Sequence, residues 1–133
     1  MTKNARLLFT SSRPLSWINT AFPFAAGYYM ISGRVDATLI VGSLFFLIPY
    51  NLLMYGINDV YDYESDLRNP RKGGVEGAVV PKEAHRFLLA WSYLLPVPFV
   101  LWLVIAGHSF LSTLVLLGCL FFVIAYSAKG LRF

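Results

Sequence analysis

Residues 37–66 read ATLIVGSLFFLIPYNLLMYGINDVYDYESD, an uncharged apolar run that ends in a cluster of acidic side chains. The run from Ala37 to Asn58 contains no charged residue and is long enough to cross a hydrocarbon layer about 30 Å thick as one helix. Four acidic residues then follow within eight positions. This change predicts a transmembrane helix whose end carries a functional site.

Two further uncharged windows flank this helix, from 14 to 33 and from 87 to 128. The second has 42 residues, and a single helix of that length would reach about twice the membrane thickness, so we expect it to fold back near Gly107-His108-Ser109. The chain is 57% hydrophobic and 14% charged, with a mean hydropathy of +0.61, which excludes an ordinary soluble domain. We therefore predict an all-α, multi-pass transmembrane bundle of four helices, with spans at about 14–33, 37–58, 87–106 and 110–128.

The basic residues predict the orientation of this bundle. Ten of the 11 Lys and Arg residues fall in segments on the same side as the N-terminus, and only Arg34 falls on the other side. We expect the N-terminus and the acidic cluster to be cytosolic, in a protein of the cytoplasmic membrane. The same bias accounts for the net charge of +4, so no nucleic-acid partner is expected.

The spacing of the acidic cluster selects some of its residues. At about 100° per residue, Asn58, Asp62 and Asp66 lie at roughly 0°, 40° and 80° around the helix, with Asp59 near 100°. Glu64 falls near 240° by the same count and points elsewhere. Because like charges one turn apart destabilise a helix, a cation is expected among the three aspartates.

Mg²⁺ suits this face, since it takes oxygen ligands and is usually held by one or two carboxylates plus substrate phosphates. The basic residues Arg68, Arg71 and Lys72 follow in a Gly-rich loop and could bind a diphosphate. At the edge of a membrane, a diphosphate with a lipid tail indicates a prenyl diphosphate, whose cation Tyr55 on the same face could stabilise. A solvated acidic helix end remains the alternative interpretation.

The motif Asn58-Asp59-x-x-Asp62-x-x-x-Asp66 resembles the first Asp-rich signature of the UbiA-type intramembrane prenyltransferases. The element from Tyr126 to Phe133 is similar to the Tyr-Ser…Arg sequence that closes the fourth helix in many members. The longer string from Asn58 to Gly74 is similar to the lycopene elongase branch, which acts on carotenoids. The resemblance implies Mg²⁺-dependent transfer of a prenyl group from an allylic prenyl diphosphate to a lipophilic acceptor such as lycopene.

The resemblance also implies roles for individual residues. The implied metal ligands are Asn58, Asp59, Asp62 and Asp66. The implied catalytic residues are Asp59, Asp62, Asp66 and Tyr126. The implied substrate-binding residues are Asn19, Asn58, Arg68, Lys72, Lys129 and Arg132. For Asn19, a packing role with a hydrogen bond remains the alternative.

The family typically has nine membrane helices and a second Asp-rich motif in its later half. Residues 1–133 carry only the part that resembles the first four helices, so we expect them to need missing C-terminal helices or a partner chain for activity. Three alternatives remain. The chain could be a non-catalytic fragment or accessory membrane subunit, an aromatic prenyltransferase of a quinone pathway, or a small metal or lipid carrier.

Overall fold

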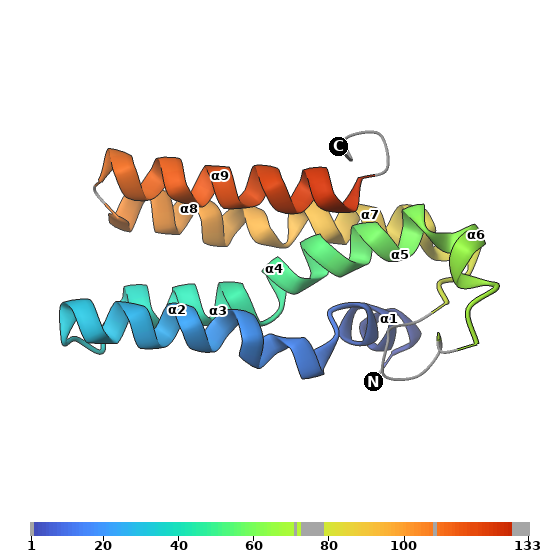
Figure 1. Cartoon of the computed structure of the whole chain (residues 1–133), viewed down its shortest axis with the longest axis horizontal. Coiled ribbons are helices and arrows are strands. Elements are labelled where there is room, and N and C mark those ends of the chain that lie inside the picture. The colour runs from blue at the N-terminus through green and yellow to red at the C-terminus, as the bar shows by residue number, and fades with distance from the viewer. Residues whose placement is uncertain (1, 71, 73–78, 108, 129–133) are drawn as a thin grey trace.

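Every element in the described part of the chain is helical, which confirms the predicted all-α fold. The computed structural model describes residues 2–70, 72, 79–107 and 109–128 (Figure 1). The elements are α1 (Lys3–Ser11), η1 (Pro14–Ser16), α2 (Trp17–Ser32), α3 (Ala37–Leu47), α4 (Pro49–Asn51), η2 (Leu52–Gly56), α5 (Ile57–Tyr61), α6 (Tyr63–Asp66), η3 (Lys82–Ala84), α7 (His85–Leu94), α8 (Pro96–Gly107) and α9 (Phe110–Ser127). Of these, η2 is a π-helix, and η1 and η3 are 3₁₀-helices.

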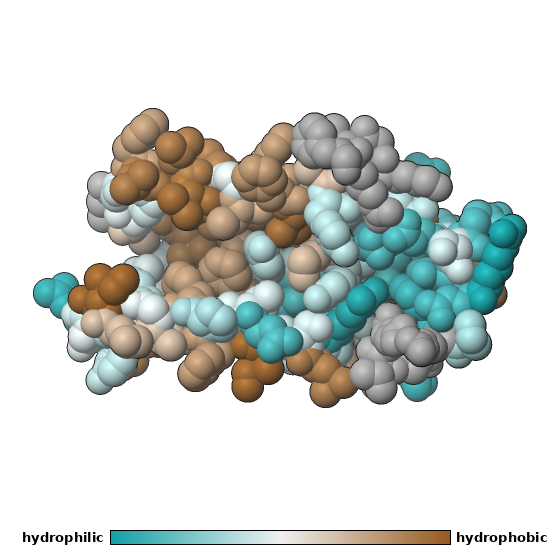
Figure 2. All heavy atoms as spheres, in the orientation of Figure 1, coloured by the Kyte–Doolittle hydropathy of each residue, from teal (hydrophilic) through white to brown (hydrophobic). Residues whose placement is uncertain are grey.

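Three helical stretches among the described residues are long and apolar enough to cross a membrane. They are Ala37–Tyr61, Lys82–Gly107 and Phe110–Ser127, and they contain or nearly match the last three predicted spans. The first predicted span, 14–33, folds as η1 and the 16-residue α2, which is shorter than these three and packs beside α3. Figure 2 shows apolar side chains over α8 and α9 and hydrophilic ones around the end that carries α6.

The turn between α2 and α3 is built from short-range contacts. Gly33 adopts a left-handed backbone (φ 63°), which suits a residue without a side chain. Asp36 then caps α3 by accepting a hydrogen bond from the Leu39 amide at 3.1 Å, and the Tyr28 hydroxyl donates to the same carboxylate at 2.8 Å. The Tyr28 and Leu39 hydrogen bonds lower the pKa of Asp36. In Figure 1 this turn lies at the end of the molecule opposite α6.

The long helix that leads to the acidic cluster is broken at Pro49, which has no backbone N–H to donate. The side chain of Asn51 compensates for the break. The two N–H groups of its Nδ2 are shared among three acceptors: the carbonyl oxygens of Phe46 (2.8 Å) and Leu47 (2.9 Å) and Thr20 Oγ1 (2.7 Å). Asn51 is fully buried, so these bonds replace the water that an exposed kink would use.

Replacing Asn51 with leucine should destabilise the protein by about 2 kcal/mol, because the Leu47 carbonyl would lose the Asn51 amide as its partner and the Phe46 carbonyl would keep only its bond from the Thr20 hydroxyl. Thermal unfolding in detergent would show this as a lower midpoint. The matched control is Asn19→Leu, which changes an exposed asparagine on the neighbouring helix and should leave the midpoint nearly unchanged. Equal midpoints for the two variants would contradict this role of Asn51.

The segment after the kink is the centre of the core. Leu53 and Ile57 pack against Val123 of α9, while Leu52, one position along the chain, packs against Leu88 of α7. The π-turn of η2 lets consecutive residues reach both neighbours, and such turns are common beside functional sites. The packing therefore fixes the position of α5, which carries the first aspartate of the motif.

A close contact also brings α7 against this segment. A Cβ atom on Gly56 would collide with Ser92 Oγ of α7, so a larger residue at this position would force the Ser92 side chain to move. Gly56 lies three residues before Asp59. The backbone that presents Asp59 is thus held between α7 and α9.

Candidate functional site

Asp59 of α5 is fully buried and forms ion pairs with two basic side chains. Its Oδ1 accepts from Arg13 Nη2 at 3.0 Å and from Lys72 Nζ at 2.8 Å. Its Oδ2 is buried and has no hydrogen-bond partner in the described part of the chain. A buried carboxylate needs compensating partners, and these two cations supply them from segments far away in the sequence.

Lys72 joins Asp59 to a second aspartate. Its Nζ lies 2.8 Å from Asp59 Oδ1 and 2.8 Å from Asp66 Oδ2, and its side chain is only 7% exposed. The backbone of Lys72 closes a turn, donating to the carbonyl of Asn69 at 3.1 Å. Burial lowers the pKa of Lys72, but the hydrogen bonds to Asp59 and Asp66 outweigh this, so its pKa is raised and it stays charged.

Arg13 is a residue of this site that no sequence pattern indicated. It has a left-handed backbone (φ 50°), which is rare for a residue with a side chain, and it links α1 to η1. Its guanidinium lies 4.2 Å from the centre of the Tyr55 ring and its buried Nε has no hydrogen-bond partner in the described chain. The only local signal was a basic residue directly before Pro14, since 46 positions separate Arg13 from Asp59.

The other motif residues keep a helical spacing although the helix is interrupted between α5 and α6. Asp62 separates α5 from α6 with a non-helical backbone (φ −93°, ψ 9°). Backbone hydrogen bonds nevertheless run from the Asp62 amide to the Asn58 carbonyl and from the Asp66 amide to the Asp62 carbonyl, each at 2.9 Å. Asn58, Asp62 and Asp66 therefore keep the spacing of successive turns that the sequence predicted.

Glu64 lies outside this network, as its helical phase predicted. Its side chain is 74% exposed and pairs at 3.1 Å with Lys82, which is 65% exposed. An ion pair in such contact with solvent contributes little to stability. Glu64 and Lys82 therefore offer matched controls for the buried acid and the buried lysine.

Two of the predicted ligands, Asp59 and Asp66, have the chemistry that a bound Mg²⁺ would need. Asp59 and Asp66 approach one cationic nitrogen, and carboxylate oxygens are ligands that Mg²⁺ prefers, with one or two sufficient where phosphates complete the shell. Among the described residues, no group of three or more His, Cys, Asp or Glu is placed to hold a metal. The four-residue set of Asn58, Asp59, Asp62 and Asp66 stays a prediction.

Tyr126, predicted to be catalytic, borders an apolar hollow of about 370 Å³. The other lining residues come from the kinked helix and from α9: Tyr50, Met54, Cys119, Phe122 and Val123. The next residue after Tyr126 ties the two helices together, because Ser127 Oγ donates to the carbonyl of Met54 at 2.7 Å. The hollow therefore lies on the helix that carries Asp59.

The remaining predicted substrate-binding residues lie outside the network of buried charges around Asp59. Asn19 and Arg68 are exposed. The residue next to Asn19, Thr20, accepts a hydrogen bond from the buried Asn51. Lys129 and Arg132 lie outside the described residues. The roles of these four residues stay predictions.

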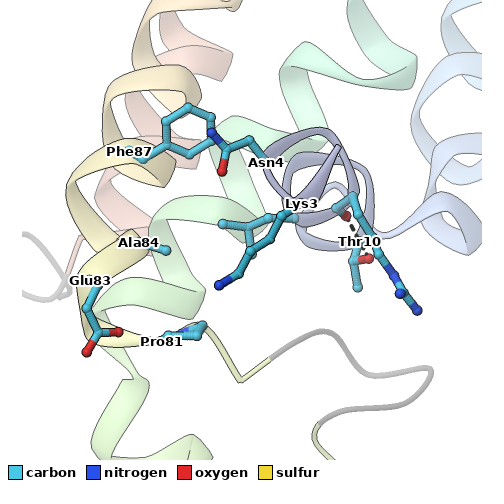
Figure 3. A pocket seen from close by; sticks show the side chains of 9 residues that line it. Lys3, Asn4, Thr10, Pro81, Glu83, Ala84 and Phe87 are labelled. Carbon is cyan, nitrogen blue, oxygen red and sulfur yellow. Dashed lines mark hydrogen bonds between the residues drawn. The ribbon is translucent and has the colours of Figure 1, made fainter. Parts of the chain in front are cut away.

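A larger hollow, of about 520 Å³, lies between α1 and the start of α7 (Figure 3). Lys3, Arg6 and Glu83 bring charges of both signs to its lining, and Phe87 adds an apolar side chain. No residue of the Asp59 network lines it. The buried charged network around Asp59 therefore lies outside the larger hollow.

Comparisons with known proteins agree on one family. The profile of the UbiA prenyltransferase family matches residues 20–133. A C(50) beta-cyclic carotenoids biosynthesis protein, LbtBC, of Dietzia sp. is 58% identical over 95% of this chain and 29% of its own length. A lycopene elongase/hydratase of Corynebacterium glutamicum is 55% identical over 100% of this chain and 46% of its own length.

More distant relatives carry the same name. A lycopene elongase/hydratase of Halobacterium salinarum is 34% identical over 65% of this chain and 41% of its own length. The chain thus spans less than half the length of each of these three relatives. No solved structure matches the chain significantly.

Proposed function

The chain belongs to the UbiA prenyltransferase family, and from this premise we propose that it carries the donor-binding part of an enzyme that prenylates a carotenoid such as lycopene. The donor would be an allylic prenyl diphosphate and the cofactor Mg²⁺. The remaining helices of the fold would come from further residues or from a partner chain, since the chain spans less than half of its relatives.

One observation carries this proposal: Asp59 and Asp66 are buried at the end of a membrane-length helix, where they pair with Lys72 and, at Asp59, with the partly buried Arg13. Buried charges are costly beside hydrocarbon and usually mark function there. A solvated acidic helix end would leave the carboxylates exposed, as Glu64 is. The burial of the aspartates therefore favours a binding site over that alternative.

The chain's cations would bind the diphosphate of the donor. Arg13 has a free Nε donor, and Lys72 has a flexible side chain that can reach a phosphate oxygen. When bound at Asp59 and Asp66, Mg²⁺ would supply charge that stabilises the departing diphosphate. The bond between the allylic carbon and the diphosphate oxygen breaks, the acceptor's π bond forms a bond to that carbon, and the acceptor then loses a proton.

The apolar hollow beside Tyr126 would hold hydrocarbon next to the reacting carbon and exclude water from it. Met54 in this hollow precedes Asp59 by five residues, about 8 Å along a helix. The names of the relatives favour lycopene as the acceptor. Tyr126 and the hollow are thus proposed to contact the acceptor and the donor's tail.

The acceptor can be tested with membranes that contain the complete protein. They would be incubated with Mg²⁺, a five-carbon allylic diphosphate, and either lycopene or a hydroxybenzoate, and the products separated by chromatography. We expect elongated carotenoid and no prenylated aromatic. Product with the hydroxybenzoate alone would refute the carotenoid assignment and place the chain in the quinone branch.

The apolar helices and the family make this an integral membrane protein. We propose that it lies in the cytoplasmic membrane with its N-terminus and acidic motif on the cytosolic side, following the distribution of basic residues. A Ser65→Cys variant that also carries Cys119→Ala tests this. An impermeant maleimide should label it only from the cytosolic side, and labelling of intact cells would contradict the orientation.

A further inference from the structure

The ammonium group of Lys72 lies between the two aspartates that would hold the metal ion. Lys72 Nζ lies 2.8 Å from each carboxylate, and its side chain is nearly buried. Arg13 contacts the same oxygen of Asp59. The four side chains carry two negative and two positive charges, so this cluster of described residues is formally neutral without an added ion.

We propose that Lys72 is a built-in counter-ion that competes with the divalent metal for Asp59 and Asp66 and is displaced when a diphosphate binds. This inference rests on the proposed function. Mg²⁺ binds oxygen at about 2.0–2.1 Å, so an ion on these carboxylates would lie within a few ångströms of Nζ. Two cations so close repel each other strongly in a site screened from water.

A diphosphate removes this conflict because it offers Lys72 another anionic partner. The lysine stem is long and flexible, and the residue sits in a turn, so Nζ can move without shifting the helices. Metal and diphosphate then bind more tightly together than separately. By linkage, each must raise the affinity of the other by the same factor.

The function of such a counter-ion is to protect the empty site. Without Lys72, two buried carboxylates would face each other beside hydrocarbon with only Arg13 to compensate them. With it, the site stays folded and neutral, and the metal is bound firmly only when the donor is present. Lys72 therefore positions the carboxylates while the site is empty and contacts the diphosphate once the donor binds.

The test measures Mn²⁺, a paramagnetic substitute for Mg²⁺, bound to the purified complete protein by electron paramagnetic resonance. Titrations would be made with and without an unreactive allylic thiolodiphosphate. Without the thiolodiphosphate, Lys72→Met should bind Mn²⁺ about tenfold more tightly than wild type, since the competing cation is gone. The increase in Mn²⁺ affinity caused by the thiolodiphosphate should be smaller in Lys72→Met than in wild type.

The matched control is Lys82→Met, which removes an exposed lysine and should behave as wild type in both titrations. Because the thiolodiphosphate binds Mn²⁺ in solution equally in all samples, differences between variants report the protein. Lys72→Gln serves as a second variant if Lys72→Met does not fold. Unchanged or weaker Mn²⁺ binding by the folded Lys72 variant would overturn the inference. If neither the wild type nor any variant bound Mn²⁺, with or without thiolodiphosphate, the proposed metal-dependent function itself would be overturned.

Discussion

Asp59→Asn is expected to lower the rate of prenyl transfer by about a thousandfold or more. The change keeps the size of the side chain but removes the charge that binds Arg13 and Lys72, and asparagine is a far weaker ligand for Mg²⁺. The rate would be measured as elongated carotenoid formed per minute in membranes with equal amounts of protein. Loss of the Asp59 carboxylate would thus weaken Mg²⁺ binding and also release Arg13 and Lys72 from their positions.

The control for this variant is Glu64→Gln, which removes an acidic charge from the same segment but from an exposed side chain. Its rate should stay within about twofold of wild type, because an exposed ion pair contributes little. Melting temperatures would establish that Asp59→Asn is folded. A folded Asp59→Asn protein with wild-type turnover would remove Asp59 from the proposed site.

Arg13→Gln is expected to raise the KM for the diphosphate donor by about tenfold to a hundredfold, the effect of losing one hydrogen bond between charged groups. Arg13→Lys should recover little of this loss, because a lysine lacks the planar guanidinium that lies over Tyr55 and presents a free Nε. Initial rates over a range of donor concentrations would separate KM from kcat.

Arg6→Gln is the matched control, because Arg6 is an exposed arginine of the preceding helix α1. It should leave the KM for the donor unchanged. A similar rise in KM for both variants would indicate a general effect of positive charge near the membrane. In that case Arg13 would have no specific contact with the donor.

The helices could be predicted because their signal is local. Uncharged windows of membrane length gave the later spans to within a few residues, except that Lys82–Gly107 begins earlier, at η3. Helical phase also separated Glu64 from Asp66, since phase depends only on spacing along the chain. The break at Pro49 and the π-turn that follows were not predicted. They depend on Asn51, Gly56 and the packing of neighbouring helices.

The site was predicted only in part because its pairing is not local. The motif predicts a cation among the aspartates, and Lys72 is predicted to bind the diphosphate. No pattern in the sequence places the Lys72 ammonium between Asp59 and Asp66. Arg13 carries only a topology signal in the sequence, and its role emerges once α1 packs against the centre of the kinked helix. Long-range ion pairs of this kind leave no periodic trace.

The most direct test of the central claim is the dependence of donor consumption on Mg²⁺ in the complete protein. Labelled five-carbon allylic diphosphate would be supplied with lycopene in proteoliposomes, and the release of diphosphate and the label in carotenoid would be followed together. We predict that chelation with EDTA stops both and that added Mg²⁺ restores both in equal amounts. Transfer that continues at full rate in EDTA would contradict a metal-dependent site at Asp59 and Asp66.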